Sequence, residues 1–487
     1  MLTRRQFAIG SAGVVSGGLA WSRLAESASD HFDRPLPIPR LIDAAKLGNA
    51  VNLRAALGRH AFVEGKPTKS YGYSAPVLGP VIRLRRGDEV QMTVENALDV
   101  DTTVHWHGLL VPGDVDGGPH QVIKAGGTWS PKLKIDQPAS TAWFHPHLHH
   151  DTGRQVYMGL AGLIIVEDGS DASLGLPRTY GLDDLPIILQ DRSFECDGSL
   201  LYDLDALTVQ YGLRGYRIVA NGVLSPVAKV PSGLVRLRIL NAANAQNFEL
   251  RFSDQREFRV IASDGGFLET PVAVRHLRIS PAERFEILVD FQNRKSVMLE
   301  TGPDTAMGIF GAVSQDDTSE FVPIVRFEPM ATQAPVRQLP PRLVTPAVAD
   351  QLKAVRRRQF KLAIGLCASG SAAGEMSTMS GSINGKPHDL ARIDVETQLG
   401  TMEIWEINAI GAAHSFHVHG AAFRILSLAN APPPAHLTGW KDVVLVEDTA
   451  DLLVAFNRPA TRERPFMYHC HILEHEDAGM MGQYVCT

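Results

Sequence analysis

The sequence is poor in cysteine, has no excess of positive charge and has no long apolar segment. Four cysteines in 487 residues are too few for a disulfide framework. The formal net charge is −6 at pH 7 and no long basic run occurs, so a nucleic-acid-binding surface is not expected. Apolar residues make up 44% of the chain without forming a membrane span. This composition indicates a soluble globular protein with a substantial core.

The cysteines also limit the disulfide chemistry. Cys470 lies between two histidines, which leaves Cys196, Cys367 and Cys486 as an odd set. At most one disulfide can form among these three, and the sequence does not say which.

The N-terminus has the features of an export signal. Arg4 and Arg5 precede a modest apolar stretch over residues 7–21 that is rich in glycine and alanine. The arginine pair followed by Gln-Phe resembles a twin-arginine signal, which predicts export to the bacterial periplasm. We expect the signal to cover residues 1–28.

The rest of the chain is predicted to be all-β. Short alternating runs at residues 81–96, 234–244 and 401–411 each end in an asparagine-containing turn, and they recur about every 150 residues. This recurrence predicts three related β-sandwiches, separated where prolines gather. A segment over residues 367–385 is rich in glycine and serine and is predicted to be a flexible loop. The expected units are residues 40–168, 180–330 and 347–487.

Histidines gather in four short stretches, and each stretch contains an H-x-H pair. On a strand, residues i and i+2 project from one face, so each pair can direct two imidazoles at one point. Eight ligands are too many for one ordinary transition-metal site, so two or three metals held together are expected. The pairs are His105 and His107, His145 and His147, His417 and His419, and His469 and His471.

A second set of residues points to the opposite face. Cys470 projects away from His469 and His471, and His414 projects away from its neighbouring pair. His475 and Met480 follow in the next loop. Two imidazoles, a thiolate and a thioether are the ligands of a blue-copper electron-transfer site.

Roles other than copper binding fit these residues less well. A single H-x-H is more often made of surface or core histidines than of ligands. Structural zinc takes four ligands and seldom includes methionine. Four pairs together with a His-Cys-His-Met set are difficult to explain by chance, and they favour copper.

With these motifs, the chain from Val77 to Tyr484 resembles the multicopper oxidases, and within them the bacterial laccase and cuprous oxidase branch. The resemblance extends to TGRQVYMGLAG (residues 152–162), VIASDGG (residues 260–266) and AERFEILVD (residues 282–290). It implies three cupredoxin-like Greek-key β-sandwich domains and four copper ions. The implied ligands are His414, Cys470, His475 and Met480 for the type 1 copper, His105 and His417 for the type 2 copper, and His107, His145 and His471 with His147, His419 and His469 for the two type 3 coppers.

The resemblance also implies an activity. We expect four one-electron oxidations of a reductant coupled to the reduction of O2 to two waters. Asp116 and Glu476 match positions where the family places acids near the cluster, so a catalytic role in proton transfer is expected. His149 and His150 are expected to lie outside the ligand set. Two rival functions are a structural protein that has lost its copper and a copper-binding protein without turnover.

The sequence does not decide the reductant. Phenols, aromatic amines, Cu(I), Fe(II) and Mn(II) all remain open. Because only Met376 and Met379 stand in the loop where cuprous oxidases are methionine-rich, we expect a laccase-like enzyme with the His475 side more open to organic reductants. We also expect a monomer. A cuprous oxidase that acts in copper tolerance is the alternative.

Overall fold

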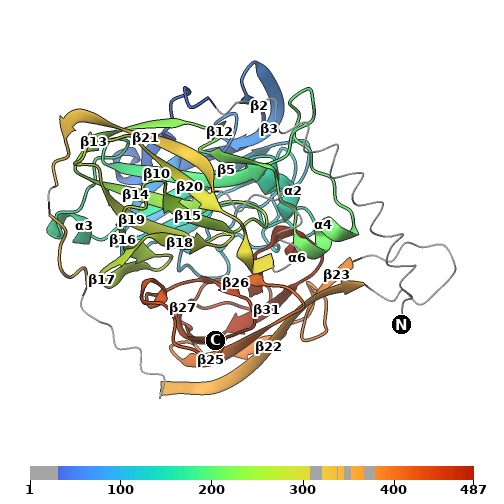
Figure 1. The fold of residues 1–487 in the computed structure, drawn as a ribbon. Helices are drawn as coiled ribbons and strands as arrows, with labels where there is room; N and C mark the ends of the chain where they lie inside the picture. The colour runs from blue at the N-terminus through green and yellow to red at the C-terminus, as the bar shows by residue number, and fades with distance from the viewer. Residues whose placement is uncertain (1–30, 308–320, 337, 345–352, 367–378) are drawn as a thin grey trace, which may run out of the picture.

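The computed structural model describes residues 31–307, 321–336, 338–344, 353–366 and 379–487. Six β-sheets and a few short helices make up this part of the chain (Figure 1). The sheets form three pairs in chain order, over residues 41–167, 184–333 and 354–486, which we call the first, second and third sheet pairs. The predicted all-β class is confirmed. The predicted export signal lies outside the described residues.

The first sheet pair combines a four-stranded and a five-stranded sheet. The two central strands of each sheet run parallel to each other. The four-stranded sheet has the order β1 (Leu41–Asp43), β4 (Val81–Arg85), β9 (Gly162–Glu167) and β8 (Ser140–Phe144). The other contains β3 (Lys66–Tyr73), β2 (Ala50–Val63), β5 (Glu89–Ala97) and β6 (Thr128–Trp129), with β7 (Lys132–Lys134) also on β5; η1 (Ala44–Leu47), α2 (Thr152–Tyr157) and α3 (Ser170–Ser173) accompany them.

The second sheet pair is the largest. Its seven-stranded sheet has the order β12 (Val223–Leu224), β11 (Arg217–Ala220), β10 (Asp184–Arg192), β14 (Leu234–Asn241), β19 (Arg284–Asp290), β16 (Phe258–Ser263) and β17 (Gly266–Val274). Its five-stranded sheet has the order β13 (Val227–Ser232), β21 (Val322–Gln333), β20 (Val297–Gly302), β15 (Phe248–Phe252) and β18 (His276–Ile279). The short helices are α4 (Ala206–Tyr211) and η2 (Thr305–Met307).

The third sheet pair consists of two five-stranded sheets. One has the order β23 (Met379–Ile383), β22 (Ala354–Leu366), β25 (Met402–Ile410), β29 (Thr449–Ala455) and β27 (Ala422–Leu428). The other has the order β24 (Val395–Thr397), β31 (Met481–Cys486), β30 (Phe466–Cys470), β26 (His414–Val418) and β28 (Val443–Val446). The short helices are η4 (Ala435–Leu437) and α6 (Leu473–Asp477).

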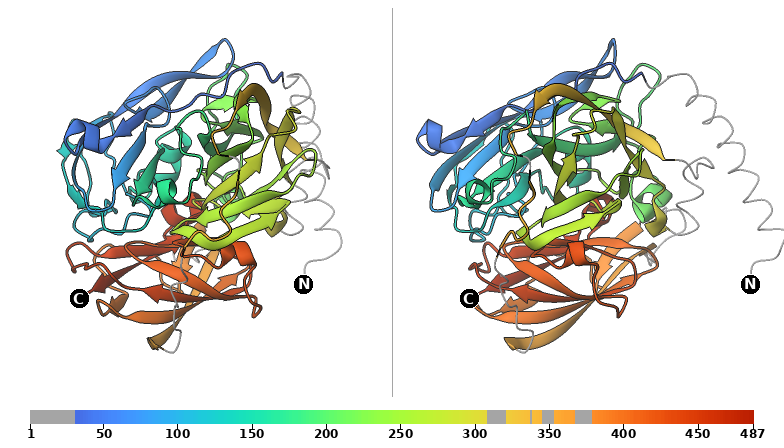
Figure 2. Two further views of the ribbon diagram at one scale, coloured as in Figure 1. Left: turned by 90° about the vertical axis from the view of Figure 1, so that its left-hand side faces the viewer. Right: turned by 60° about the vertical axis from the view of Figure 1, so that its left-hand side comes forward.

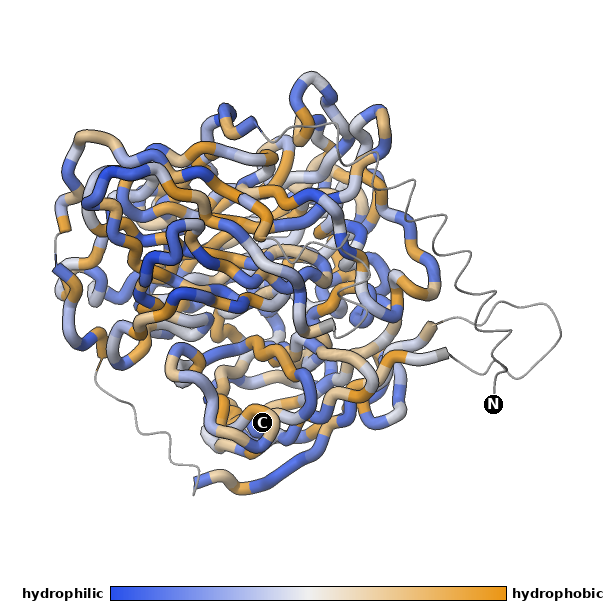
Figure 3. The backbone as a smooth tube through the Cα atoms, in the orientation of Figure 1, coloured by the Kyte–Doolittle hydropathy of each residue, from blue (hydrophilic) through white to orange (hydrophobic). Residues whose placement is uncertain are grey.

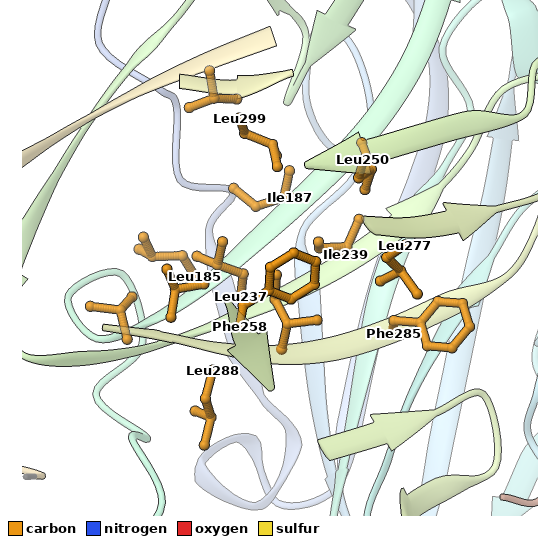
Figure 4. Close-up of a cluster of buried hydrophobic side chains, with 14 of the residues drawn as sticks. Leu185, Ile187, Leu237, Ile239, Leu250, Phe258, Leu277, Phe285, Leu288 and Leu299 are labelled. Carbon is orange, nitrogen blue, oxygen red and sulfur yellow. The ribbon is translucent and has the colours of Figure 1, made fainter. Parts of the chain in front are cut away.

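Each sheet pair encloses its own apolar core, because strand residues alternate between the core and the opposite face. Apolar and polar stretches accordingly alternate along the chain (Figure 3). In the second sheet pair, Leu237 and Ile239 of β14 pack against Leu250 of β15 and Leu277 of β18, which belong to the facing sheet (Figure 4). Three such sandwiches are held by three separate cores.

Strand β14 departs from the expected alternation, because nearly all of its residues are buried. Its arginines face the first sheet pair rather than solvent. Arg238 donates to Asp184 at 2.8 Å and to Thr141 of β8 at 3.0 Å. A charged strand face can be buried here because each guanidinium has carboxylate partners.

The predicted asparagine turns have a shared structure in two of the three repeats. Asn96 accepts from Leu98 N through Oδ1 at 3.0 Å, and Asn241 accepts from Ala243 N in the same way at 3.0 Å. Each side-chain amide also donates to two main-chain oxygens. The third asparagine, Asn408, instead donates to the Glu406 carboxylate.

The prediction of a flexible loop over residues 367–385 is partly wrong. Residues 379–383 form strand β23, which pairs with β22 through main-chain hydrogen bonds that need no large side chains. Met376 and Cys367 lie outside the described residues. Cys196 and Cys486 are free thiols.

The three sheet pairs meet at a small fourth core. It contains Trp143 from the first, Ile188 and Leu240 from the second, and Val443 from the third. In Figure 2 the third sheet pair, orange to red, lies against both of the others. No helix among the described residues is long and apolar enough to cross a membrane.

Candidate metal centres

Eight histidines meet where the first sheet pair faces the third, and each is at most 1% exposed. His105 and His145 lie opposite each other in an antiparallel bridge, and His417 of β26 lies opposite His469 of β30. Because alternate residues of an extended segment share a face, each segment adds a second ring two residues further on. We call this group the eight-histidine site; its other members are His107, His147, His419 and His471.

Most of these rings are held at Nδ1 by protein oxygen atoms. A neutral imidazole that donates from Nδ1 keeps its lone pair on Nε2. His105, His145, His417 and His469 donate from Nδ1 to the main-chain oxygens of Asp116, Pro146, Asp442 and Cys470, at 3.1, 2.7, 2.7 and 3.0 Å respectively. Their lone pairs are therefore left to face the interior of the site.

These lone pairs face one another at short range. His469 Nε2 lies 3.1 Å from His419 Nε2 and 3.2 Å from His147 Nε2. Burial, followed by the neighbouring imidazoles, lowers the pKa of His147 and of His419 well below the usual value, so both rings are neutral at pH 7. Opposed lone pairs repel unless a cation lies between them. Imidazole nitrogens suit copper and related transition metals, so the donor set fits such ions.

A second group lies on the other side of β30, and we call it the cysteine site. His414 Nδ1 lies 3.2 Å from His475 Nδ1, and the Cys470 thiol sulfur lies 3.5 Å from each of these nitrogens. Burial raises the pKa of the Cys470 thiol far above its usual range, so a thiolate here requires a neighbouring cation. The arrangement of two imidazoles and one thiol fits a soft transition metal.

Met480 lies beside the cysteine site. Its side chain is buried in the same cluster as Cys470, and its main-chain oxygen accepts from Cys470 N at 3.2 Å. The expected loop between β30 and β31 contains a short helix, α6, and this helix carries His475. Met480 follows Gly479, whose φ of +98° makes the turn from α6 into β31.

Strand β30 joins the two groups. Cys470 pairs with Phe416 and His469 pairs with His417 of β26, so the thiol and the neighbouring imidazole point to opposite faces. His471, the next residue, returns to the eight-histidine site. Three consecutive residues therefore contact both groups.

The two predicted acids contact rings of the eight-histidine site. Asp116 Oδ2 accepts from His419 Nδ1 at 2.8 Å and lies 3.3 Å from His105 Nδ1. Glu476 lies 3.3 Å from His147 Nδ1 and 3.2 Å from His469 Nδ1. Both carboxylates are buried.

The His475 side of the cysteine site is covered, contrary to the expectation of an open approach. His475 is fully buried, and its Nε2 donates to the main-chain oxygen of Gln210 at 3.0 Å. Gln210 belongs to α4, which lies against α6 (Figure 1). The helix α4 of the second sheet pair therefore covers His475 at the place where the low methionine content had suggested open access.

His149 and His150 lie apart from the eight histidines. Their rings are 3.6 Å apart, and His149 also contacts His388, with ring centres 4.9 Å apart. His150 contacts the main-chain oxygen of Asp477 through Nδ1 at 2.7 Å.

Sequence reasoning missed Asp442 and Arg284. Asp442 Oδ1 accepts from His107 Nε2 at 3.1 Å, and Arg284 donates to both Asp442 oxygens. Arg284 stands in the motif at residues 282–290, which was given no role, and Asp442 belongs to a Lys-Asp pair directly before the apolar strand β28, where buried charges are unusual.

Comparison with known proteins places this geometry in a family. Three multicopper oxidase profiles match residues 56–171, 212–300 and 363–487. The chain is 34% identical to the multicopper oxidase mco of Staphylococcus aureus, over 93% of this chain and 92% of that protein. It is also 35% identical to the cell division protein FtsP of Pectobacterium atrosepticum, over 99% and 98% of the two chains.

Solved structures agree. A bacterial laccase-like multicopper oxidase, CueO, from a lignin-degrading Ochrobactrum species is 45% identical, with a TM-score of 0.85 over 93% of this chain and 100% of the other; its oxidase activity is towards lignin model compounds and lignosulfonate. A multicopper oxidase of Pediococcus acidilactici is 33% identical, with a TM-score of 0.80 over 94% and 92%. Both support the expected cupredoxin-like fold. Because the profiles match in order and the relatives align over almost their whole length, the chain belongs to the multicopper oxidase family and is a copper oxidoreductase.

Proposed function

We propose that the protein is a laccase-like oxidase that holds four copper ions. Copper bound there would supply one-electron redox chemistry, coupling the oxidation of four reductant molecules to the reduction of one O2 to two waters with uptake of four protons. The residues that would hold them are His414, Cys470, His475 and Met480 for one ion, His105 and His417 for a second, His107, His145 and His471 for a third, and His147, His419 and His469 for the fourth.

The observation that carries this proposal is the pair of buried donor groups joined by His469, Cys470 and His471. In the eight-histidine site, the Nε2 lone pairs of His419 and His469 lie too close to each other to be stable without a cation. In the cysteine site, the Cys470 sulfur lies 3.5 Å from the Nδ1 atoms of both His414 and His475. The surrounding protein holds most of the rings by their other nitrogen, which keeps these donors in place before any ion binds. Burial of both groups also excludes bulk water.

Protons must reach the eight-histidine site, and we assign their transfer to Asp116 and Glu476. Asp116 contacts two of the rings through Oδ2, while its Oδ1 has no hydrogen-bond partner among the described residues. Neither oxygen of Glu476 makes a well-aligned hydrogen bond there either. Carboxylate oxygens with spare acceptor capacity can take up and release protons beside the site.

Phenols and similar aromatic compounds are the proposed reductants. The helix α4 stands between His475 and solvent, and it presents apolar side chains outward. Leu207 is 63% exposed and Leu204, just before the helix, is 40% exposed. Aromatic rings gain free energy by covering such surface, and the Gln210 carbonyl links it to His475.

Cuprous oxidation is the second candidate, and Met379 is the observation that favours it. Met379 begins β23, which packs beside both α4 and α6, so a half-buried thioether lies near the cysteine site. Thioethers are soft ligands that suit Cu(I). The kcat/KM values for a dimethoxyphenol and for chelated Cu(I), in wild type and in Met379→Leu, would separate the two. A preference for Cu(I) that Met379→Leu abolishes would favour copper tolerance.

The cellular setting belongs to the proposal as well. The arginine pair at residues 4 and 5 supports export through a twin-arginine route to the periplasm. We propose that the exported protein is a monomer.

Metal analysis with oxygen uptake tests the function directly. The copper-loaded protein should contain four coppers per chain and consume one O2 for every four one-electron equivalents of reductant. A protein that binds copper without oxygen uptake would instead be a copper-binding protein. A folded protein that retains no copper would point to a structural role.

A further inference from the structure

A group of buried charged side chains lies where the three sheet pairs meet. Arg284 begins β19 of the second sheet pair and is 0% exposed; Asp442 lies just before β28 of the third and is 5% exposed. Arg284 donates from Nη1 to Asp442 Oδ1 at 2.7 Å and from Nη2 to Oδ2 at 2.6 Å. Because the guanidinium is a planar fork of donors, the bidentate pair fixes both Asp442 oxygens as acceptors.

Asp442 fixes two rings of the eight-histidine site. Its Oδ1 accepts from His107 Nε2 at 3.1 Å, and its main-chain oxygen accepts from His417 Nδ1 at 2.7 Å. With the proton of His107 on Nε2, the lone pair lies on Nδ1. That nitrogen is 3.4 Å from Nε2 of His145, on the interior of the site.

His107 is held differently from its neighbours. Five of the other rings contact protein oxygens through Nδ1, which leaves Nε2 as the donor atom: His105, His145, His417, His419 and His469. His107 must offer Nδ1 instead, and only an acceptor at Nε2 selects that tautomer. The carboxylate of Asp442 is the acceptor in contact with it.

Main-chain oxygens of the first and second sheet pairs also hold Arg284. Its Nε donates to Thr141 O at 3.0 Å, and its Nη1 donates to Ala282 O at 3.0 Å. Gly108, directly after His107, has a φ of +86°, and a Cβ there would lie 2.4 Å from Arg284 Nη2 and 3.0 Å from Asp442 Oδ2. The missing side chain at this position lets the ion pair approach the histidine segment.

We propose that Arg284 and Asp442 are positioning residues that present Nδ1 of His107 to the metal. This inference rests on the proposed copper site. The second sheet pair contributes none of the twelve proposed ligands, yet through Arg284 it determines how one of them is offered. Carboxylates that hold a ligand histidine typically change metal affinity or activity about 10- to 100-fold when they are replaced.

The same network supplies a matched control. Lys441 Nζ lies 2.8 Å from Asp264 and 3.0 Å from Glu283, and all three residues are buried. Glu283 contacts Lys441 and Ser280. Glu283→Gln therefore removes a buried charge from the network without removing a contact to the eight histidines.

The test compares Asp442→Asn with Glu283→Gln. In Asp442→Asn, one of the two oxygens becomes an NH2 group that points at a donating nitrogen of Arg284, whichever way the amide is turned. The bidentate pair is then lost, and the acceptor for His107 Nε2 is no longer held in place. We expect Asp442→Asn to lose copper from the eight-histidine site and to keep the blue absorption of the cysteine site. After reduction, this variant should be reoxidised by O2 at least tenfold more slowly than wild type. Glu283→Gln should retain four coppers, even if its thermal unfolding midpoint falls by as much as that of Asp442→Asn.

A positioning role and a merely structural role predict different results. If both variants lose the same amount of copper at the same loss of stability, the network is merely structural and the proposal is overturned. An Asp442→Asn protein with four coppers and an unchanged rate of reoxidation by O2 would also overturn it. If Asp442→Asn does not fold, Arg284→Lys serves as the second variant. It keeps the charge but loses the bidentate geometry, and unaltered copper content and rate there would also overturn the proposal. A wild-type protein that binds no copper would instead refute the proposed function.

Discussion

Replacing Glu286 with glutamine should weaken the contact between the first and second sheet pairs in a pH-dependent way. Glu286 is 1% exposed. It accepts from Arg236 Nε at 2.8 Å, from Arg238 Nη1 at 2.8 Å and from Thr141 Oγ1 at 2.6 Å. Glutamine keeps the shape but directs an NH2 group at a guanidinium, so both arginines lose a charged partner.

The size of the effect follows from the pKa of the carboxyl group. Although burial alone would raise it, Arg236 and Arg238 outweigh burial and lower the pKa of Glu286 from 4.5 to about 2. One pKa unit corresponds to about 1.4 kcal/mol, so the ionised carboxylate contributes about 3 kcal/mol. Because the folded pKa is depressed, this contribution is complete above pH 4.5 and is lost as the pH falls towards 2.

Denaturant unfolding of the metal-free protein at several pH values measures this contribution. At pH 7, Glu286→Gln should be about 3 kcal/mol less stable than wild type, and the difference should shrink steadily as the pH falls from 4.5 towards 2. Glu95→Gln is the control, since its partner Arg54 and Glu95 itself are half exposed and such pairs contribute at most about 1 kcal/mol. A difference that stays constant across the pH range would refute the electrostatic origin of the effect.

Three further predictions concern the proposed sites. Cys470→Ser should abolish the blue absorption while about three coppers per chain remain by metal analysis; a blue variant would contradict the ligand assignment. Asp116→Asn and Glu476→Gln should each slow O2 reduction by on the order of 10²-fold while anaerobic reduction by substrate keeps its rate, as measured by stopped flow. Equal slowing of both half-reactions would indicate general damage. Leu207→Asp should raise KM for a dimethoxyphenol several-fold without changing the copper content, and an unchanged KM would remove α4 from the docking surface.

Much of the fold could be predicted because strand patterning is local. The alternation in residues 89–97 and 402–410 is visible in the sequence and appears as β5 and β25. The two-residue spacing of each H-x-H pair also limits the two rings to one face of an extended segment. Strand β23 was missed because its main-chain pairing with β22 leaves no apolar pattern in a glycine- and serine-rich segment.

The contacts that sequence reasoning could not supply are those between distant segments. Gln210 is 265 positions from His475, and Arg284 is 158 positions from Asp442. No sequence spacing predicts either contact, since each depends on how the sheet pairs pack against one another. The expected open approach to His475 was wrong for this reason, because it considered only the segment nearest in the sequence.

The alternation of β30 has a consequence for how this protein can vary. One residue inserted between His469 and Cys470 would exchange the two faces, turning the thiol towards the eight histidines and the imidazole of His471 towards His414. The separation of the two groups is therefore set by the covalent geometry of one short peptide and stays constant whatever the reductant. Divergence among relatives should accumulate in surface segments such as α4, whereas length changes within β30 should be absent from active members of the family.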